Sequence, residues 1–424
     1  MSKLHRTHPH PRGAVPSPRG LLRRATTLGL LLTLAALLSL AACGGKEPRQ
    51  AVGRLDTPEH HARRGNDFLL KDDYAAAESA FDQALSLKRD YSPALAGKAI
   101  VTAYAAGQGG KERKDKVEQA EDYFHDALKR AANDDEKRVA SIAGIRVQQL
   151  AKPSDGWLND AADYYDDAVD LDERNNDPAP HFYMARAYRD AFQMQDASRL
   201  YKQVLEMNRG LVGEADAELA VVQKIERAAP GTLHGRVVAF EPTISRADLA
   251  ALFVEEMKLP ELYERGNQAR FDTRFKAPQQ NTFQADVLQK APEMTDVDDH
   301  PLRADILEVV RLRVSGLQPD AAHKYHPDAK ITRGEFAIMV EDILVRVTGE
   351  QGLKTKFIGQ PSPFADVRND LHYFNAVQTV TSRNLMEPKN KLQGVFAPTE
   401  PLTGADALLV IRLLKNELQR YIRS

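Results

Sequence analysis

Residues 65–84 read GNDFLLKDDYAAAESAFDQA, and the spacing within this stretch decides the fold of the first half of the chain. Ala77, Phe81 and Ala84 are separated by four and three residues, which places them on one face of a helix. Small side chains let a second helix approach closely, and the aromatic ring fills the space between the two helices. Gly65 provides the matching small position 12 residues upstream of Ala77. The stretch therefore predicts a pair of packed helices.

The same spacing recurs three more times before residue 210. The further sets are Ala120, Phe124 and Ala127; Ala161, Tyr165 and Ala168; and Ala197, Tyr201 and Val204, with Ala99, Gly144 and Ala185 as their upstream small residues. This pattern resembles the tetratricopeptide repeat, most closely in the first and fourth copies, because the second and third have longer turns. The resemblance implies antiparallel helix pairs over residues 58–212 whose concave surface binds a protein segment. The alternative is a spacer with no binding role.

The N-terminal region predicts export and a lipid anchor. Residues 1–24 are basic and residues 28–40 are almost all Leu and Ala, a run shorter than the ~20 apolar residues that span a membrane. Together they predict a signal peptide over residues 1–42. The sequence LAAC at 40–43 resembles the lipobox of bacterial lipoproteins, which implies a diacylglyceryl group and an acylated amino terminus on Cys43. The alternative is an ordinary signal peptide with a chance cysteine.

The residues after Cys43 indicate how the chain is held. Residues 43–57 contain Gly, Pro and few apolar side chains, so they predict a flexible tether. The lipoprotein resemblance implies an outer-membrane location in a Gram-negative cell, because Gly44 departs from the inner-membrane retention signal. We therefore expect a protein of the cell envelope that has the membrane as a partner through its lipid.

A second unit begins near residue 213 and occurs three times. Each copy has an aromatic-x-Pro triplet, followed after a short gap by an apolar residue, Thr or Ser, any residue, a small residue and an acid. The copies contain FEP and ISRAD at 240–248, YHP and ITRGE at 325–335, and FAP and LTGAD at 396–406. The hydroxyl residue followed three positions later by an acid predicts a helix N-cap with a capping box. Capping alone does not explain the recurring aromatic-x-Pro triplet.

These units resemble the S-layer homology motif, which typically occurs in three tandem copies. The resemblance covers residues 213–416, with a polar insert at 259–292 and a C-terminal tail at 417–424, and the middle copy is the best match. It implies a compact, mostly helical triplet with grooves between the copies. Such grooves bind cell-wall polysaccharide, often with a pyruvylated sugar, or a peptidoglycan-linked polymer in some Gram-negative envelopes.

The resemblance also implies which residues bind the polysaccharide. The family's binding arginine follows the Thr of the motif, which points to Arg246 and Arg333, supported by Ser245, Thr332 and Thr403. A guanidinium suits a carboxylate ligand because it donates two parallel hydrogen bonds. The third copy has Gly404 at the arginine position, so at most two sites are complete. The alternative is that each arginine is a surface residue paired within its own helix.

Composition and missing motifs narrow the function further. The 424-residue chain has 58 basic and 60 acidic residues, a balance that argues against nucleic acid as a partner. Cys43 is the single cysteine, which excludes an intramolecular disulfide. The sequence has no phosphate-binding loop, nucleophile elbow or zinc-protease motif, and His60-His61 is more simply a solvated pair. We therefore expect no catalytic residue, no metal site and no cofactor.

The sequence as a whole predicts an all-α protein in which a tetratricopeptide-like array precedes three S-layer homology-like motifs. The leading hypothesis is a non-catalytic lipoprotein that links a membrane to cell-wall polymer, with the helical repeats as spacer or protein-docking platform. The alternative is an accessory lipoprotein for envelope assembly or secretion, in which the repeat groove carries the function and the second half is a degenerate scaffold.

Overall fold

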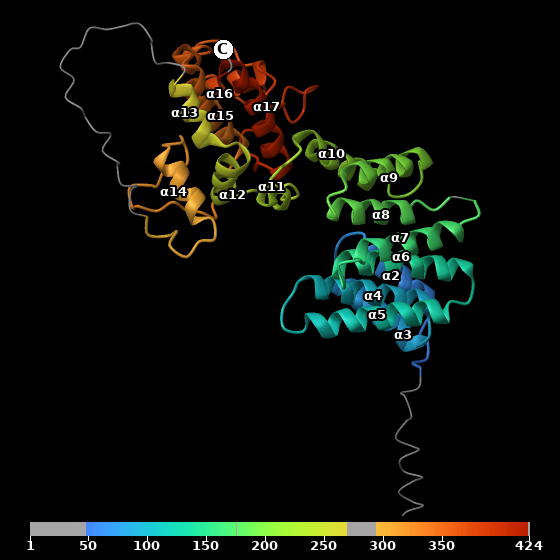
Figure 1. The fold of residues 1–424 in the computed structure, drawn as a ribbon. Coiled ribbons are helices and arrows are strands. Elements are labelled where there is room, and N and C mark those ends of the chain that lie inside the picture. Colours follow the sequence, from blue (N-terminus) through green and yellow to red (C-terminus); the bar gives the residue numbers. More distant parts are fainter. Residues whose placement is uncertain (1–47, 175, 269–293, 423–424) are drawn as a thin grey trace, which may run out of the picture.

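The computed structural model describes residues 48–174, 176–268 and 294–422. Within these ranges every regular element is a helix (Figure 1). Extended segments there pair only through isolated bridges, such as that between Ser245 and Lys330. The predicted all-α fold is thus confirmed. None of the helices in these ranges combines the length and the apolar character needed to cross a membrane. The predicted signal peptide, Cys43 and residues 269–292 of the predicted insert lie outside the described residues.

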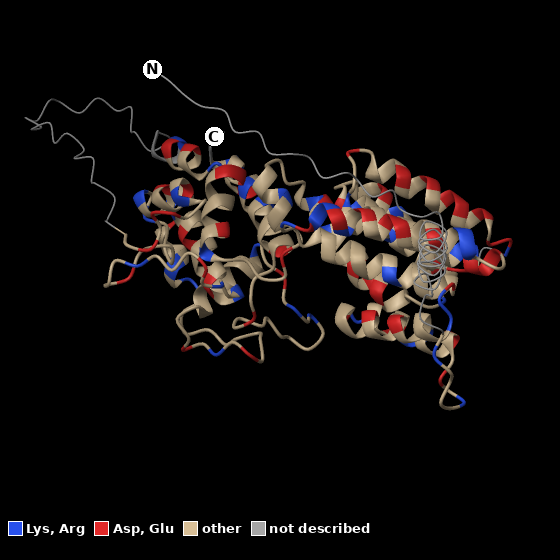
Figure 2. Ribbon diagram, turned by 90° about the horizontal axis from the view of Figure 1, so that it is seen from below, with Lys and Arg blue, Asp and Glu red and all other residues tan. Residues whose placement is uncertain are grey.

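The first half is an array of antiparallel helix pairs. Its helices are α2 (Pro58–Leu69), α3 (Tyr74–Leu87), α4 (Ser92–Gly107), α5 (Arg113–Arg130), α6 (Asp134–Ala151), α7 (Trp157–Asp170), α8 (Ala179–Asp190) and α9 (Met194–Met207). Each even-numbered helix packs against the next helix along the chain, and α4, α6 and α8 follow one another through the array. Basic and acidic residues both occur on the helices of the array, but α3 and α7 carry acidic residues and no basic ones (Figure 2). The arrangement is that of a helical repeat array.

The small and aromatic positions explain why these helices pack so closely. Phe81 is fully buried, and a Cβ on Gly65 would lie 2.5 Å from its ring. Gly97 of the next pair faces the same ring, since a Cβ there would lie 2.2 Å away. Gly144 faces Phe124 in the same way, at 2.8 Å. Each aromatic ring therefore occupies the space that a missing side chain leaves on a neighbouring helix.

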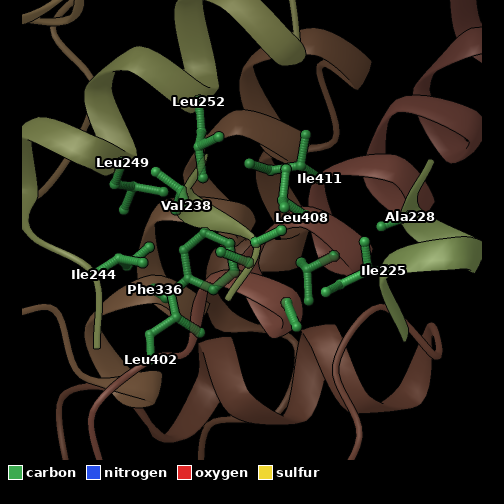
Figure 3. Close-up of a cluster of buried hydrophobic side chains, with 14 of the residues drawn as sticks. Ile225, Ala228, Val238, Ile244, Leu249, Leu252, Phe336, Leu402, Leu408 and Ile411 are labelled. Atoms are coloured by element: carbon green, nitrogen blue, oxygen red, sulfur yellow. The ribbon is translucent and has the colours of Figure 1, made fainter. Parts of the chain in front are cut away.

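The second half contains shorter helices joined by long turns. They are α10 (Val212–Ala228), α11 (Leu233–Val238), α12 (Arg246–Ala251) with a π-helical turn at Leu252–Glu256, α13 (Leu259–Gln268), α14 (Arg303–Arg311), α15 (Arg333–Thr348) with a 3-10 turn at Gln351–Thr355, α16 (Phe374–Ser382) and α17 (Gly404–Ile422). Apolar side chains from α10, α11, α12, α15 and α17 meet in one core (Figure 3).

Two segments differ from the sequence interpretation. The predicted insert begins with helix α13, which packs against α15 because Leu259 and Leu262 are buried there. The predicted tail begins inside α17, which continues to Ile422. Leu414 and Leu418 are both fully buried, so the apolar face of this helix extends beyond residue 416. Residues 417–422 are thus part of the last helix.

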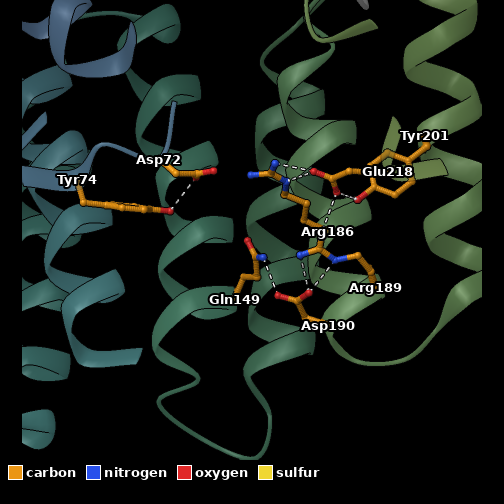
Figure 4. A network of polar contacts seen from close by, with 8 residues as sticks. All are labelled: Asp72, Tyr74, Gln149, Arg186, Arg189, Asp190, Tyr201 and Glu218. Atoms are coloured by element: carbon orange, nitrogen blue, oxygen red, sulfur yellow. Dashed lines mark hydrogen bonds and ion pairs between the residues drawn. The ribbon is translucent and has the colours of Figure 1, made fainter. Parts of the chain in front are cut away.

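Helix α10 joins the two halves. It packs against α9 on one side and against α17 on the other (Figure 1). Glu218 of α10 accepts hydrogen bonds from Arg186 Nε (2.8 Å), from Arg189 Nη1 (2.8 Å) and from the Tyr201 hydroxyl (Figure 4). Burial by itself would lower the pKa of Arg189, but the carboxylates of Asp190 and Glu218 outweigh this effect and raise the pKa above its usual value. The opening helix of the second half therefore caps the repeat array, and the halves share one junction.

Candidate functional site

The three motifs of the second half meet around a closed ring of backbone hydrogen bonds. Ile331 N–H donates to the carbonyl of Ile244 (3.2 Å), Leu402 N–H donates to Ile331 (2.8 Å), and Ile244 N–H donates to Leu402 (3.0 Å). These are the apolar residues that precede the Ser or Thr of each motif, and all three are buried. Ile244 and Leu402 lie beside Phe336 in the core (Figure 3). The three copies are therefore related by an approximate threefold axis.

The hydroxyl residues of the motifs start helices, as their spacing predicts. The Ser245 side chain accepts a hydrogen bond from Asp248 N–H (3.1 Å), and Thr332 forms the same capping box with Glu335. Thr403 accepts from Asp406 N–H at 3.1 Å. Each cap lies directly after the ring of backbone bonds, so it positions the first helical residue of its motif.

Arg246 binds the loop of the next motif. Its Nε, Nη1 and Nη2 atoms donate to the backbone carbonyls of Tyr325 (2.8 Å), Gly316 (2.6 Å) and Gln318 (3.1 Å). Its guanidinium lies over the Tyr325 ring, 4.7 Å from the centroid. These contacts join the first and middle motifs, and they engage every nitrogen of the guanidinium.

Arg333 makes the equivalent contact between the middle and third motifs. Its Nε donates to the carbonyl of Phe396 (3.1 Å), its Nη2 donates to that of Glu387 (2.7 Å), and its guanidinium lies 4.8 Å from the centroid of the Phe396 ring. The remaining nitrogen, Nη1, lies 3.9 Å from the Asp406 carboxylate. Arg333 is only 4% exposed, and this burial lowers the pKa of its guanidinium group.

The aromatic-x-Pro triplet is the part of the loop that these arginines hold. An aspartate at the start of each of the last two motifs binds the same loop from its other side. Asp296 accepts from the backbone N–H groups of Tyr325 and His326 (both 2.8 Å), and Asp366 accepts from those of Phe396 (2.9 Å) and Ala397 (2.6 Å). Burial opposes ionisation of Asp296, but these backbone donors lower its pKa. The recurrent Asp, aromatic and Arg residues thus form one clasp between successive motifs.

Gly404 closes the ring of motifs without an arginine. A Cβ built on Gly404 would lie 1.7 Å from the carbonyl oxygen of Val238, at the end of α11. Its N–H donates to the carbonyl of Glu241 at 2.9 Å. The backbone of the first motif therefore occupies the place that a side chain would need. Glycine fits at position 404 because it has no Cβ to prevent this close approach.

A groove of about 720 Å³ lies between α10, α17 and the loop at 384–389. Its charged lining residues are Lys224, Arg227, Arg333, Lys389 and Arg412, with Glu387 and Asp406 as the acids. Lys224 donates to Asp406 at 2.7 Å, and this contact outweighs burial to lower the pKa of the Asp406 carboxyl. Arg227 and Arg412 are exposed, and neither forms an ion pair with any residue that the structure describes. The groove therefore offers two uncompensated guanidinium groups to an anion.

The structure places the predicted site residues in different surroundings. Arg333 lines the groove, whereas Ser245, Arg246, Thr332 and Thr403 are not among its lining residues. Sequence reasoning missed Lys224, Arg227 and Arg412. Lys224 and Arg227 are three residues apart on α10, a spacing that puts them on one helix face, but no local pattern in the sequence relates them to Arg412. In the described ranges, no group of three or more His, Asp or Glu side chains is placed to hold a metal ion.

Comparison with protein families assigns the third motif. Residues 363–408 match the S-layer homology domain, a segment that contains Asp366, Phe396 and Gly404. No curated protein matches the chain. S-layer homology domains bind cell-wall polymers and are not catalytic. The chain therefore contains an S-layer homology domain at residues 363–408, which associates it with the cell envelope.

Proposed function

We propose that this protein is a non-catalytic envelope lipoprotein that links a membrane to an anionic cell-wall polymer. The groove between α10 and α17 carries the proposal, because cations predominate in it and it borders the S-layer homology domain. The lipobox-like sequence at 40–43 supports the membrane end through lipid on Cys43. The helical repeats act as a spacer or as a platform for a protein partner.

The ligand that fits this groove is a polymer bearing carboxylate or phosphate groups. A guanidinium donates two parallel hydrogen bonds to such a group, and Arg227 and Arg412 are exposed to do so. Arg333 would lie at the base of the groove. Ser245, Arg246, Thr332 and Thr403 would shape the binding surface by holding the motifs together, since their side chains make internal contacts.

The experiment is co-sedimentation of the chain from Gly44 onward with isolated cell-wall sacculi. We expect the wild type to pellet, and we expect the Arg227→Gln, Arg412→Gln double variant to bind about tenfold more weakly, because two charge-assisted contacts are lost. Arg246 and Arg333 are unsuitable targets, since their removal would also break contacts between the motifs. The matched control removes two exposed charges elsewhere, Lys111→Gln with Lys114→Gln.

The possible outcomes separate the groove from the wider proposal. The groove would be supported as the binding site if the control variant pelleted with the sacculi as the wild type does and the double variant pelleted less. Equal pelleting of all three proteins would show that another surface binds the wall and would overturn the assignment of the groove. If no protein pelleted, the wall-linking function itself would be wrong.

A further inference from the structure

A second cavity lies on the first half of the chain, away from the basic groove. It has a volume of about 280 Å³ and is lined by residues from α2, α4, α6 and α8 and from the segments next to them. Leu70, Ile100, Val139, Ile142 and Tyr183 provide its apolar and aromatic surface, and Leu70 is half exposed. The exposed Asn66 adds an amide to the lining. The cavity is therefore a mainly apolar groove across four repeats.

Arg146 is the unusual residue in this groove. It lies on α6, it is only 6% exposed, and its guanidinium carbon lies 4.4 Å from the centroid of the Tyr183 ring. Among the residues that the structure describes, it has no hydrogen-bond or ion-pair partner. Burying a charge without a counterion is costly, and one aromatic face compensates for only part of this cost.

The neighbouring charges do not neutralise Arg146. Asp177, the acid in the lining, accepts a hydrogen bond from Arg138 Nε (3.2 Å) and from Ala179 N–H (2.9 Å). Other cations of the array have carboxylate partners: the buried Lys98 pairs with Glu78 at 2.8 Å, and the partly buried Arg186 pairs with Glu218. Arg146 thus differs from them in that its counterion is missing.

We propose that this groove binds an extended protein segment that presents a carboxylate between apolar side chains, with Arg146 as the partner of the carboxylate. The apolar lining would take up the flanking side chains, and Asn66 would bind the peptide backbone. A peptide fits better than a fatty acid, because the lining contains polar groups in addition to the arginine: the amide of Asn66 on α2 and the carboxylate of Asp177 in the segment before α8. The inference deepens the docking role of the repeats and does not depend on binding to the wall.

The test uses the chain from Gly44 onward and two immobilised peptide libraries. Both libraries have five residues of randomised Leu, Ile, Val, Phe and Ala, but one has Asp or Glu at the centre and the other has Asn or Gln. All peptides are amidated at the C-terminus so that the central group supplies the only carboxylate. We expect the wild type to bind the best acidic peptides about 10- to 100-fold more tightly than their amide counterparts, as for a charge-assisted pair shielded from water.

Variants of Arg146 test the assignment of the residue. Arg146→Gln should lose the preference for the acidic library, whereas the exposed Arg130→Gln on α5 should retain it. Arg146→Met should be at least as thermally stable as the wild type, because it removes an uncompensated buried charge. A clearly less stable Arg146→Met variant would show that the arginine is structural and would overturn the proposal.

The remaining outcomes are equally decisive. Failure to bind either library, or equal binding to both, would overturn the proposal, and so would displacement of bound peptides by oleate, which would assign the groove to a lipid. Each variant is also tested on sacculi. Retained wall binding together with lost peptide binding would separate failure of this groove from failure of the wall-linking function.

Discussion

At the residue scale, Gly404 occupies the position at which the first two motifs have arginine. In sequence it indicates a missing ligand contact, but in the fold it allows the Val238 carbonyl to approach the backbone. Arg246 and Arg333 show the same relation from the other side. The position of each in its motif indicates a ligand-binding residue, but in the fold each donates hydrogen bonds to backbone carbonyls of the next motif. These three residues therefore stabilise the contacts between the motifs.

The glycine leads to a first prediction. Gly404→Ala should lower the free energy of unfolding by about 3 kcal/mol, because the added Cβ meets backbone that can move only with the whole first motif. Urea unfolding followed by circular dichroism measures the change. Gly213→Ala is the control, since a Cβ there meets no atom within 4 Å, and it should leave stability within about 1 kcal/mol of the wild type. Equal stability of Gly404→Ala and the wild type would show that the contact with Val238 relaxes cheaply.

At the scale of elements, α10 belongs to both halves of the chain. Glu218 on one face binds arginines of α8, and Lys224 binds Asp406 of α17, 182 residues away in sequence. The side chain of Glu218 is 17% exposed, so its contacts are largely shielded from solvent. Burial and the Glu218 carboxylate together raise the pKa of the Tyr201 hydroxyl, which keeps this hydroxyl a hydrogen-bond donor. Side-chain contacts of helix α10 therefore connect the two halves.

Removing the carboxylate should uncouple the halves. We expect Glu218→Ala to lower the free energy of unfolding by about 3 kcal/mol, because two partly buried guanidinium groups lose their counterion. We also expect the repeat array to unfold before the second half in differential scanning calorimetry. Glu214→Ala is an exposed replacement on the same helix and should be nearly silent. A single transition at the wild-type temperature in Glu218→Ala would contradict the coupling.

At the scale of the whole molecule, the proposed attachment points come from distant parts of the sequence. Cys43 would hold a membrane, and the groove between α10 and α17 would hold the wall polymer. The helical repeats lie between these two points along the chain. Such an order suits a linker, because a rigid array of packed helices keeps two attachment points apart.

The lipid end is tested by metabolic labelling of cells with an alkyne analogue of palmitate. Wild-type protein should carry the label, and Cys43→Ser should not, because the hydroxyl does not accept the thioether-linked lipid. The purified chain from Gly44 onward, which lacks Cys43 and therefore its lipid, should still pellet with sacculi. An unlabelled wild type would mean that the predicted leader is an ordinary signal peptide.

The sequence by itself determined the all-α fold, the helix pairs and the capped helix starts, because these depend on side chains three or four residues apart. Phe81 against Gly65 and Thr332 with Glu335 are examples that local spacing predicts and the structure contains. The sequence did not indicate that the segment after residue 258 begins with a packed helix or that the last helix continues past residue 416. The burial of Leu259 and Leu418 that accompanies these helices depends on contacts with distant helices.

Only the tertiary structure decided which guanidinium groups are available to a ligand. The sequence motif indicates Arg246 as a ligand-binding residue and does not indicate Arg227, but carbonyls about 70 to 80 residues away bind Arg246, and Arg227 is exposed in a groove. The absence of a counterion at Arg146 is likewise visible only in the folded chain. The physical reason is that the hydrogen bonding and burial of a side chain depend on loops that the fold brings together, and the spacing of residues within one segment does not predict these long-range contacts.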